Sequence, residues 1–233
     1  MTTRREQLAT NVNSVQQQII SACAQSKRHI DDITLIAVTK TWPASDIELL
    51  SDLGVTDIGE NRDQEARPKH DQLAELPVTW HAIGQLQTNK VKSVCQWADV
   101  LHSVDRPSLV AALAKATADR AQPLGVFIQV SLDSEFDPNR GGCRPADMLD
   151  LADSIVQIDG LSLLGVMGVA PLSGDTHEAF ANLQQHSQTL TRTFPQAHFI
   201  SAGMSDDFEV AIKFGATHLR IGSLILGHRS YEG

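Results

Sequence analysis

Apolar runs of strand length alternate with stretches of helical spacing along almost the whole chain, and this alternation limits the possible folds most. The strand-like runs lie near residues 33–38, 55–58, 79–83, 99–104, 125–130, 162–167, 197–201 and 217–221. Between them, apolar residues recur at helical spacing, as at Leu109, Ala112, Leu113 and Ala116. Repeated strand–helix units form parallel sheets, so eight units predict an α/β fold closed into a (β/α)8 TIM barrel.

An additional amphipathic helix is predicted before the first strand. Its apolar positions, which fall on one helical face, are Leu8, Val12, Val15 and Ile19. The chain has 233 residues, an ordinary length for one barrel, and no linker rich in Pro, Gly or Ser divides it. We therefore expect a single barrel domain over residues 1–233.

Composition argues against several kinds of partner and site. The net charge is −9 and the basic residues do not cluster, which disfavours binding to nucleic acid or to an anionic membrane. No run is apolar enough to span a membrane, and the polar start of the chain does not resemble a signal peptide. Cys23, Cys95 and Cys143 are widely spaced and form no metal-binding pattern. We expect a cytoplasmic protein with reduced thiols, with Cys23 and Cys95 in the core, and without a metal site.

The stretch LIAVTKTWP, residues 35–43, places Lys40 at the end of the first buried strand. A lysine in this position can simply extend its ammonium group into water. It can also act as a nucleophile or form a Schiff base, provided that the strand end shields it partly from water. Because active sites of barrels lie at the carboxyl ends of the strands, the predicted fold favours the second interpretation.

Polar residues close other strands as well: Asn61 in DIGEN, His81 in WHAIG, Ser201 in FISAGMSDD and Arg220 in HLRIGS. Each of them alone fits a structural role. Asn61 resembles a helix N-cap because Gln64 follows three residues later, and a lone His81 fits a hydrogen-bonded core residue. Their arrival at one rim of the barrel from different strands instead predicts a shared functional site.

The segment RIGSLILG, residues 220–227, carries the best signal for phosphate binding. Gly222 would let the backbone approach an anion closely, and Ser223 would add a hydroxyl group beside free helix N–H groups. The same residues also fit a plain helix cap. Barrels commonly bind phosphate after their last strands, which favours the phosphate interpretation.

A second helix start, SAGMSDD at residues 201–207, is less suited to an anion. Asp206 and Asp207 occupy its first turn, where they suit the helix dipole but would repel a phosphate lying over the helix end. We therefore expect Ser205 to cap this helix and Ser201 to contact a phosphate from the side.

Several motifs resemble the pyridoxal phosphate homeostasis protein family, in the same order along the chain. They are AVTK with Lys40, IGENR at 58–62, WHAIGQLQTNK at 80–90, LHSVDR at 101–106, GVMG at 165–168 and SAGMSDDFEVAIKFGATHLRIGS at 201–223. The resemblance covers nearly the whole chain, and WHAIGQLQTNK is its most specific motif. It implies the barrel of alanine racemase, the type III fold of pyridoxal-phosphate proteins, and pyridoxal 5′-phosphate as cofactor.

The resemblance also implies roles for individual residues. Lys40 would form the internal aldimine, a Schiff base, and Arg220 would face the pyridine nitrogen. The phosphate would be held by Ser201, Gly222 and Ser223. The ring would be lined by Asn61, His81 and Met167. Because an arginine stays protonated and can only donate, the ring nitrogen would remain unprotonated and the ring would be a weak electron sink.

Two segments depart from the family pattern. Residues 133–145, DSEFDPNRGGCRP, are longer and richer in Arg and Gly than the family's usual segment, and residues 168–175, GVAPLSGD, form a variant loop. Both are expected to flank the mouth of the site. The resemblance therefore assigns no role to Arg140 or Arg144.

Three classes of function fit these residues: a non-catalytic cofactor carrier, a pyridoxal-phosphate-dependent racemase or transaminase, and a Schiff-base aldolase without cofactor. The resemblance disfavours the aldolase, since the lysine and phosphate positions then coincide with a cofactor site. Barrel-type alanine racemases use a tyrosine from an additional β domain, whereas the one tyrosine here is Tyr231, near the end of the chain. We therefore predict a carrier without catalytic residues, a monomer whose partners are pyridoxal 5′-phosphate and apo forms of enzymes that use it.

Overall fold

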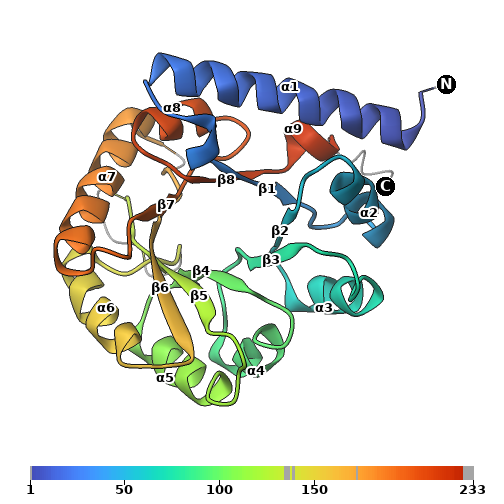
Figure 1. Ribbon diagram of the computed structural model, residues 1–233. Helices are drawn as coiled ribbons and strands as arrows, with labels where there is room; N and C mark the ends of the chain where they lie inside the picture. Colours follow the sequence, from blue (N-terminus) through green and yellow to red (C-terminus); the bar gives the residue numbers. More distant parts are fainter. Residues whose placement is uncertain (1, 134–136, 138–139, 172, 228–233) are drawn as a thin grey trace.

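Eight parallel strands pair in chain order, and β1 pairs with β8 to close a barrel (Figure 1). The computed structural model describes residues 2–133, 137, 140–171 and 173–227. The strands are β1 (Thr34–Val38), β2 (Asp57–Glu60), β3 (Thr79–Ala82), β4 (Val100–Val104), β5 (Leu124–Gln129), β6 (Leu161–Met167), β7 (Phe199–Ser201) and β8 (His218–Ile221). This architecture confirms the predicted (β/α)8 fold.

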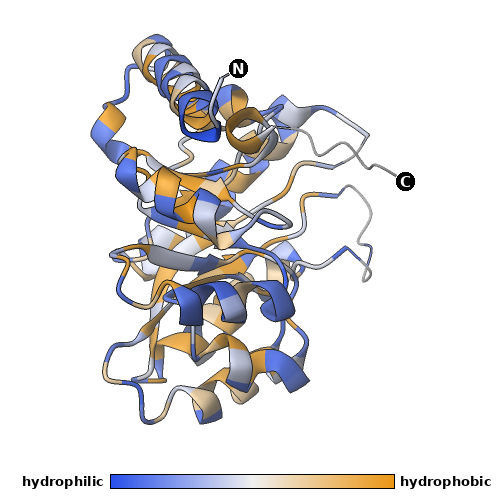
Figure 2. Ribbon diagram, turned by 90° about the vertical axis from the view of Figure 1, so that its right-hand side faces the viewer, coloured by the Kyte–Doolittle hydropathy of each residue, from blue (hydrophilic) through white to orange (hydrophobic). Residues whose placement is uncertain are grey.

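A ring of helices surrounds the strands (Figure 1). The α-helices are α1 (Arg4–Gln25), α2 (Ala44–Asp52), α3 (Asp63–Gln72), α4 (Val91–Val94), α5 (Pro107–Ala116), α6 (Met148–Val156), α7 (Thr176–Thr193), α8 (Phe208–Lys213) and α9 (Ser223–Leu226). Short 3₁₀ helices are η1 (Ile30–Asp32), η2 (Thr88–Lys90) and η3 (Pro145–Asp147). Figure 2 shows hydrophobic and hydrophilic residues alternating along the helices, as expected when one face of each helix packs on the barrel.

The strands are apolar on both faces because helices cover the outside and side chains fill the inside. β5 is buried at every position. β6 approaches β7 so closely that a β-carbon on Gly165 would lie 1.9 Å from the carbonyl oxygen of Phe199, so this position requires glycine. β2 begins later than the sequence predicts, because Gly54 and Val55 donate backbone hydrogen bonds to the end of α2 and complete its turn.

The predicted N-terminal helix is present as α1. It starts with a capping box in which the Thr3 hydroxyl accepts from the Glu6 amide at 3.2 Å, while the Glu6 carboxylate accepts from the Thr3 amide at 2.8 Å. The apolar residues expected on its inner face are all buried, namely Leu8, Val12, Val15 and Ile19. Helical spacing therefore located both the helix and its packing face.

α1 fastens the first strand–helix unit of the barrel to the last. The Arg4 guanidinium pairs with the Asp46 carboxylate of α2 at 2.7 Å and donates to the carbonyl of Leu226 at 3.1 Å. Asn11 donates to the carbonyl of Ile225 at 2.8 Å. The helix therefore lies across the junction of β1 and β8, outside the barrel (Figure 1).

The cysteines are all buried and unpaired, as predicted for Cys23 and Cys95. Burial raises the pKa of the Cys143 thiol to about 12, so this group is a poor nucleophile at neutral pH. In the part of the chain that the structure describes, we find no helix with the length and hydropathy needed to span a bilayer.

Candidate cofactor site

Lys40 lies in the turn that follows β1, at the carboxyl end of the barrel. The strand itself ends at Val38, and Lys40 is exposed, so the shielding expected from the sequence is absent. The next residue, Thr41, has a φ of +67°, a left-handed conformation that is uncommon for a β-branched residue. The Glu65 carboxylate of α3 accepts from the Thr41 amide at 2.8 Å and stabilises this turn.

The residue before the lysine is held by a buried ion pair. The Thr39 hydroxyl donates to Glu60 Oε1 at 2.7 Å, and Lys69 Nζ donates both to the Thr39 carbonyl at 2.9 Å and to Glu60 Oε1 at 2.6 Å. Burial raises the pKa of Glu60, although its contacts with Lys69 and Thr39 oppose this shift. The end of β2 and helix α3 therefore fix both neighbours of Lys40.

Arg220 is a buried cation on β8, the strand paired with β1. It lies opposite Ile36 in the register, and its side chain donates to Ser201 Oγ at 2.6 Å and to the Gly168 carbonyl at 3.0 Å. Burial lowers the pKa of Arg220 to about 10, with the Asp207 charge opposing the shift. The guanidinium group is therefore still protonated at neutral pH and can only donate hydrogen bonds.

The Ser201 hydroxyl lies between two partners inside the barrel. It accepts from Arg220 and lies 2.8 Å from Nδ1 of His102, and the residue is fully buried. A hydroxyl group has one proton to donate. If Ser201 donates it to His102, Ser201 cannot donate to a phosphate, so the predicted phosphate contact requires the hydroxyl group to turn away from this histidine. Met167, also buried, is the β6 neighbour of Ser201 in the sheet.

Gly222 and Ser223 form the turn from β8 into α9, as the sequence predicts. The atoms nearest to a β-carbon built on Gly222 all belong to Val38, at 3.5–3.9 Å, so neighbouring side chains leave the backbone accessible. Ser223 is half-buried and begins α9. A turn with an accessible backbone, a hydroxyl group and helix N–H groups fits a phosphate.

Asn61 follows β2 at the same rim and is exposed. It does not cap α3, whose N-cap is Arg62 without a side-chain capping bond. The Asn61 carbonyl instead packs against Gly84 after β3, where a β-carbon would come within 2.2 Å. This contact brings the segments after β2 and β3 together.

Helix α8 is also not capped by the residue that the sequence predicts, Ser205. The N-cap of α8 is Asp207, two residues after Ser205, and its carboxylate accepts from the Met204 amide at 2.6 Å. Burial raises the pKa of Asp207, although the Met204 hydrogen bond opposes this shift. The helix therefore starts later than the spacing of the motif suggests.

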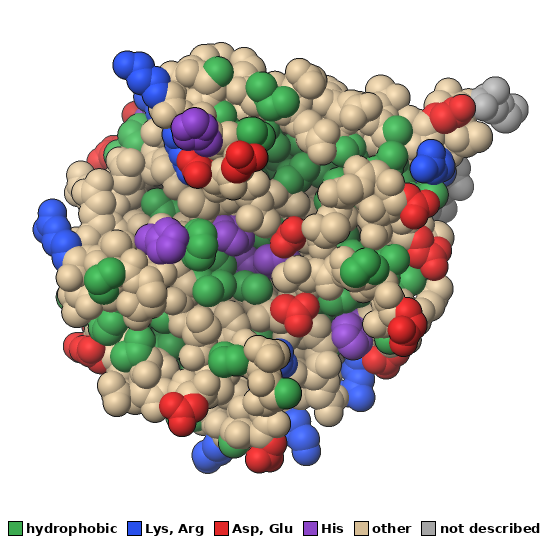
Figure 3. Space-filling model, viewed as in Figure 1, with side chains coloured by type: hydrophobic (Ala, Val, Ile, Leu, Met, Phe, Trp, Pro, Cys, Tyr) green, Lys and Arg blue, Asp and Glu red, His purple; other side chains and the backbone are tan. Residues whose placement is uncertain are grey.

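His81 lies deep in the barrel, and both of its ring nitrogens have partners. Nε2 is 2.9 Å from Asp57 Oδ1, and Nδ1 is 2.9 Å from Nε2 of His102. His218 packs beside them, with its ring centroid 6.5 Å from that of His81. In the space-filling view, histidine side chains are visible in the hollow at the centre of the barrel (Figure 3).

Sequence reasoning missed Asp57, His102 and His218, although a signal existed. His81 and His102 occupy adjacent strands, and period-2 alternation would have placed both on inward-facing positions. Burial lowers the pKa of His102 well below its usual range, and lowers that of His218 to about 4. Both are therefore neutral at pH 7.

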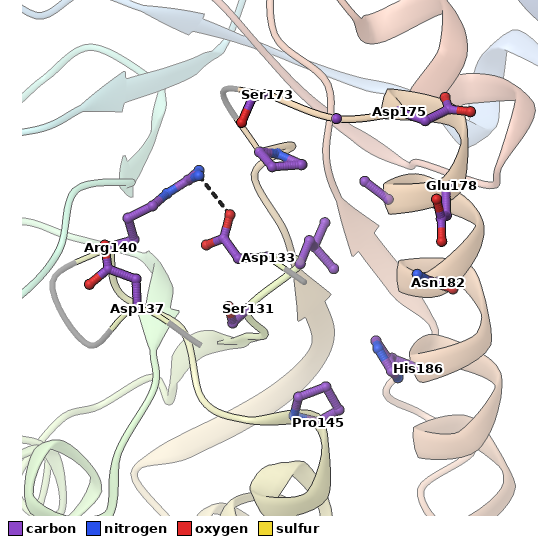
Figure 4. Close-up of a pocket in the computed structure, with 14 residues that line it drawn as sticks. Ser131, Asp133, Asp137, Arg140, Pro145, Ser173, Asp175, Glu178, Asn182 and His186 are labelled. Carbon is purple, nitrogen blue, oxygen red and sulfur yellow. Dashed lines mark hydrogen bonds and ion pairs between the residues drawn. The ribbon is translucent and has the colours of Figure 1, made fainter. Parts of the chain in front are cut away.

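A separate cavity of about 620 Å³ lies between the carboxyl ends of β5 and β6 and helix α7 (Figure 4). Arg140 pairs there with Asp133 at 2.7 Å and donates to the Ala170 carbonyl at 3.3 Å. None of the residues predicted to bind the cofactor lines this cavity in the described part of the chain. Residues 134–136, 138–139 and 172 of the two variant segments, and Tyr231, lie outside the described residues.

Comparison with known proteins identifies the family. The alanine racemase N-terminal domain model matches residues 6–230. A pyridoxal phosphate homeostasis protein of Mycobacterium leprae is 37% identical, over 96% of this chain and 93% of its own length. This chain belongs to the pyridoxal phosphate homeostasis protein family. The resemblance inferred from the motifs is thus confirmed.

Several solved structures share the barrel of this chain. The structure of PipY from Synechococcus elongatus PCC7942 with PLP bound matches with a TM-score of 0.82 and 30% identity, over 94% of this chain and 100% of that one. Alanine racemase from Corynebacterium glutamicum has a TM-score of 0.72 at 12% identity, over 98% of this chain and 62% of that one. This second likeness shows the alanine-racemase-type fold.

Proposed function

We propose that this protein binds pyridoxal 5′-phosphate on Lys40 and serves as a carrier or buffer in homeostasis of the cofactor. The observation that carries the proposal is the pairing of β1 with β8, which places the Lys40 turn beside the strand of Arg220 and the Gly222 turn. The PLP-bound structure of PipY and the names of the homeostasis relatives support it.

Each part of the site would contribute one kind of contact. When bound, the cofactor supplies an aldehyde that condenses with a primary amine, and Lys40 provides that amine at an exposed position from which a bound ligand can be released. The turn at Gly222 and Ser223 would hold the phosphate, and Arg220 would face the ring nitrogen. Asn61 and Met167 would flank the ring.

The same residues argue against enzymatic turnover. The charged Arg220 guanidinium can only donate a hydrogen bond, so the ring nitrogen facing it would stay unprotonated and the ring would withdraw electrons weakly from a bound amino acid. A racemase of this fold would need a tyrosine as its second base. The single tyrosine of this chain is at position 231, after the last strand of the barrel in the sequence. We propose that the protein acts in the cytoplasm as a monomer and passes the cofactor to apo-enzymes.

The carrier and enzyme alternatives are separated by one experiment. Purified protein loaded with pyridoxal 5′-phosphate is incubated with L- and D-amino acids in deuterated water, and the α-proton is followed by NMR. We expect no appreciable exchange, together with transfer of the cofactor to an added apo-enzyme. Rapid exchange that is lost in Lys40→Ala would overturn the carrier proposal and favour a racemase or transaminase.

A further inference from the structure

Five side chains form one continuous line of hydrogen bonds through the interior of the barrel. Arg220 Nη1 lies 2.6 Å from Ser201 Oγ, which lies 2.8 Å from His102 Nδ1. His102 Nε2 lies 2.9 Å from His81 Nδ1, and His81 Nε2 lies 2.9 Å from Asp57 Oδ1. The line joins strands β8, β7, β4, β3 and β2 and connects the predicted cofactor site with the start of β2.

With both imidazole rings neutral, the chemistry of the two ends sets the direction of every hydrogen bond. Arg220 can only donate and an ionised Asp57 can only accept. The arrangement that gives each buried proton a partner has Ser201 donating to His102, His102 donating from Nε2 to His81, and His81 donating from Nε2 to Asp57. We therefore assign both histidines as neutral rings with the proton on Nε2.

Burial makes this arrangement costly to disturb. His102 and Ser201 are fully buried, and His81 is 2% exposed. The His102 ring also stacks on Phe127 with a centroid distance of 4.7 Å, which limits its rotation. A second proton on His102 would point at the hydroxyl proton of Ser201, or would force that proton to turn away and lose its acceptor. Burial also disfavours the charged ring and lowers the pKa of His102.

We propose that Asp57, His81 and His102 are positioning residues that, through Ser201, orient Arg220 toward the cofactor ring. This proposal rests on the proposed function, because it concerns the contact between Arg220 and the ring nitrogen. The Arg220 guanidinium donates to Ser201 Oγ and to the Gly168 carbonyl, which are both neutral oxygens. The hydrogen-bonded line extends one of these contacts to a carboxylate, Asp57, whose side chain is 24% exposed.

The arrangement also explains why His81 belongs to a functional motif without an open ring nitrogen. Its Nδ1 and Nε2 are both used within the line. His81 would therefore influence the cofactor through Arg220, rather than by direct contact with the ring. Substitution of Ser201, His102 or His81 by a group that cannot both accept and donate would break the line and weaken the contact that orients Arg220, which would still donate to the Gly168 carbonyl.

The first test measures the tautomers without any cofactor. In ¹⁵N-histidine-labelled protein, two-bond ¹H–¹⁵N correlations at pH 7 should show His81 and His102 as neutral rings protonated on Nε2. An Nδ1-protonated ring or an imidazolium at either position would overturn the proposed direction of the line. His218, which hydrogen-bonds to Thr217 Oγ1 at 2.8 Å and lies outside the line, serves as an internal reference for assignment.

The second test measures how strongly the protein recognises the ring nitrogen. Affinities are compared for pyridoxal 5′-phosphate and for the analogue in which a C–H group replaces the ring nitrogen. We expect the wild type to prefer the natural cofactor by about tenfold or more, as for a hydrogen bond from a charged donor. His102→Phe should lose most of this preference, whereas His218→Phe, a matched change in the same interior, should keep it.

A milder pair of variants covers the case in which His102→Phe does not fold. Asp57→Asn retains an acceptor for His81 but removes the charge, and should reduce the preference about threefold. Asp99→Asn is its control, because Asp99 accepts from the Trp80 amide at 2.9 Å at the same end of the barrel but is not in the line. Full preference in folded His102→Phe or Asp57→Asn would overturn the proposal. Failure of the wild type to bind either compound would instead refute the cofactor role, and the tautomer measurement would still test the line.

Discussion

The ammonium group of Lys69 lies 2.6 Å from Glu60 Oε1 and at the same time donates to the carbonyl of Thr39, the residue before Lys40. The Glu60 side chain is fully buried and that of Lys69 is 12% exposed. This buried pair therefore connects helix α3 to the turn that carries the predicted attachment lysine. A change in the pair is expected to affect both the stability of the protein and the shape of that turn.

Replacing Lys69 by methionine should destabilise the protein strongly, because the Glu60 carboxylate would stay buried without its counter-charge. Removing one partner of a buried pair typically costs about 3–5 kcal/mol. A carboxyl group whose folded pKa is raised contributes stability at low pH and loses it as pH rises, so the deficit should shrink when the pH is lowered toward 4.5. Urea unfolding at pH 7 and pH 5 measures this. Lys92→Met, at an exposed position of α4, is the control, and equal stabilities of the two variants would contradict the prediction.

Lys40→Ala should abolish attachment of the cofactor while leaving the fold intact, because Lys40 is exposed in a turn held by its neighbours. Wild-type protein with pyridoxal 5′-phosphate should show a visible imine absorbance that borohydride removes, and the variant should show none. Lys90→Ala, which changes a half-buried lysine of η2, should keep the absorbance. An adduct that survives in Lys40→Ala and disappears in Lys90→Ala would move the attachment site to Lys90.

Two glycine substitutions should separate binding from folding. At Gly222 the nearest atoms to a new β-carbon are at 3.5 Å, so Gly222→Ala should change the unfolding free energy by less than about 1 kcal/mol. It should nevertheless weaken binding of pyridoxal 5′-phosphate by about 2 kcal/mol, through lost hydrogen bonds to the phosphate, and affect pyridoxal much less. Gly203 has a φ of +93° and a β-carbon there would lie 2.9 Å from Phe208 and Ala211, so Gly203→Ala should mainly destabilise the fold. Equal binding of pyridoxal and its phosphate by the wild type would contradict the phosphate assignment.

Stability should fall as the pH is lowered below 6.5, because burial holds the folded-state pKa of His218 at about 4. The unfolded chain then binds a proton that the folded protein does not, at about 1.4 kcal/mol per pH unit for one histidine. The stabilising contribution is complete above pH 6.5 and is lost progressively down to about pH 4. Unfolding by urea across this range should show a shallower pH dependence in His218→Asn than in the wild type. His198→Asn, at an exposed site, should retain the wild-type slope.

The barrel was predictable from the sequence because its signals are local. Apolar runs and helical spacing depend on neighbouring residues, and so α1 and every predicted strand are present, although β2 and β7 begin later than predicted. The rim position of Lys40 follows from the topology alone. Family membership followed from motifs, which carry more information than spacing does.

The contacts of the site were less predictable because they join residues far apart in the chain. Nothing in the sequence around Lys40 shows that Glu60, Glu65 and Lys69 hold its turn. The capping predictions at Asn61 and Ser205 were wrong, since a cap depends on the backbone angles at one residue and the helices start later. The partners of His81 depend on strand register, which composition does not reveal.

The N-terminal helix has a consequence for how such a barrel could open. A closed sheet has no edge, but its first and last strands meet at a seam that no covalent connection spans, and here the seam runs between β1 and β8. Lys40 follows β1 on one side of this seam, and Arg220 lies on β8 on the other side. α1 bridges the seam through the hydrogen bonds of Arg4 and Asn11. Because β1 and β8 also pair directly, loosening α1 would lower the resistance of this junction to opening, and with it the restraint on the distance between Lys40 and Arg220.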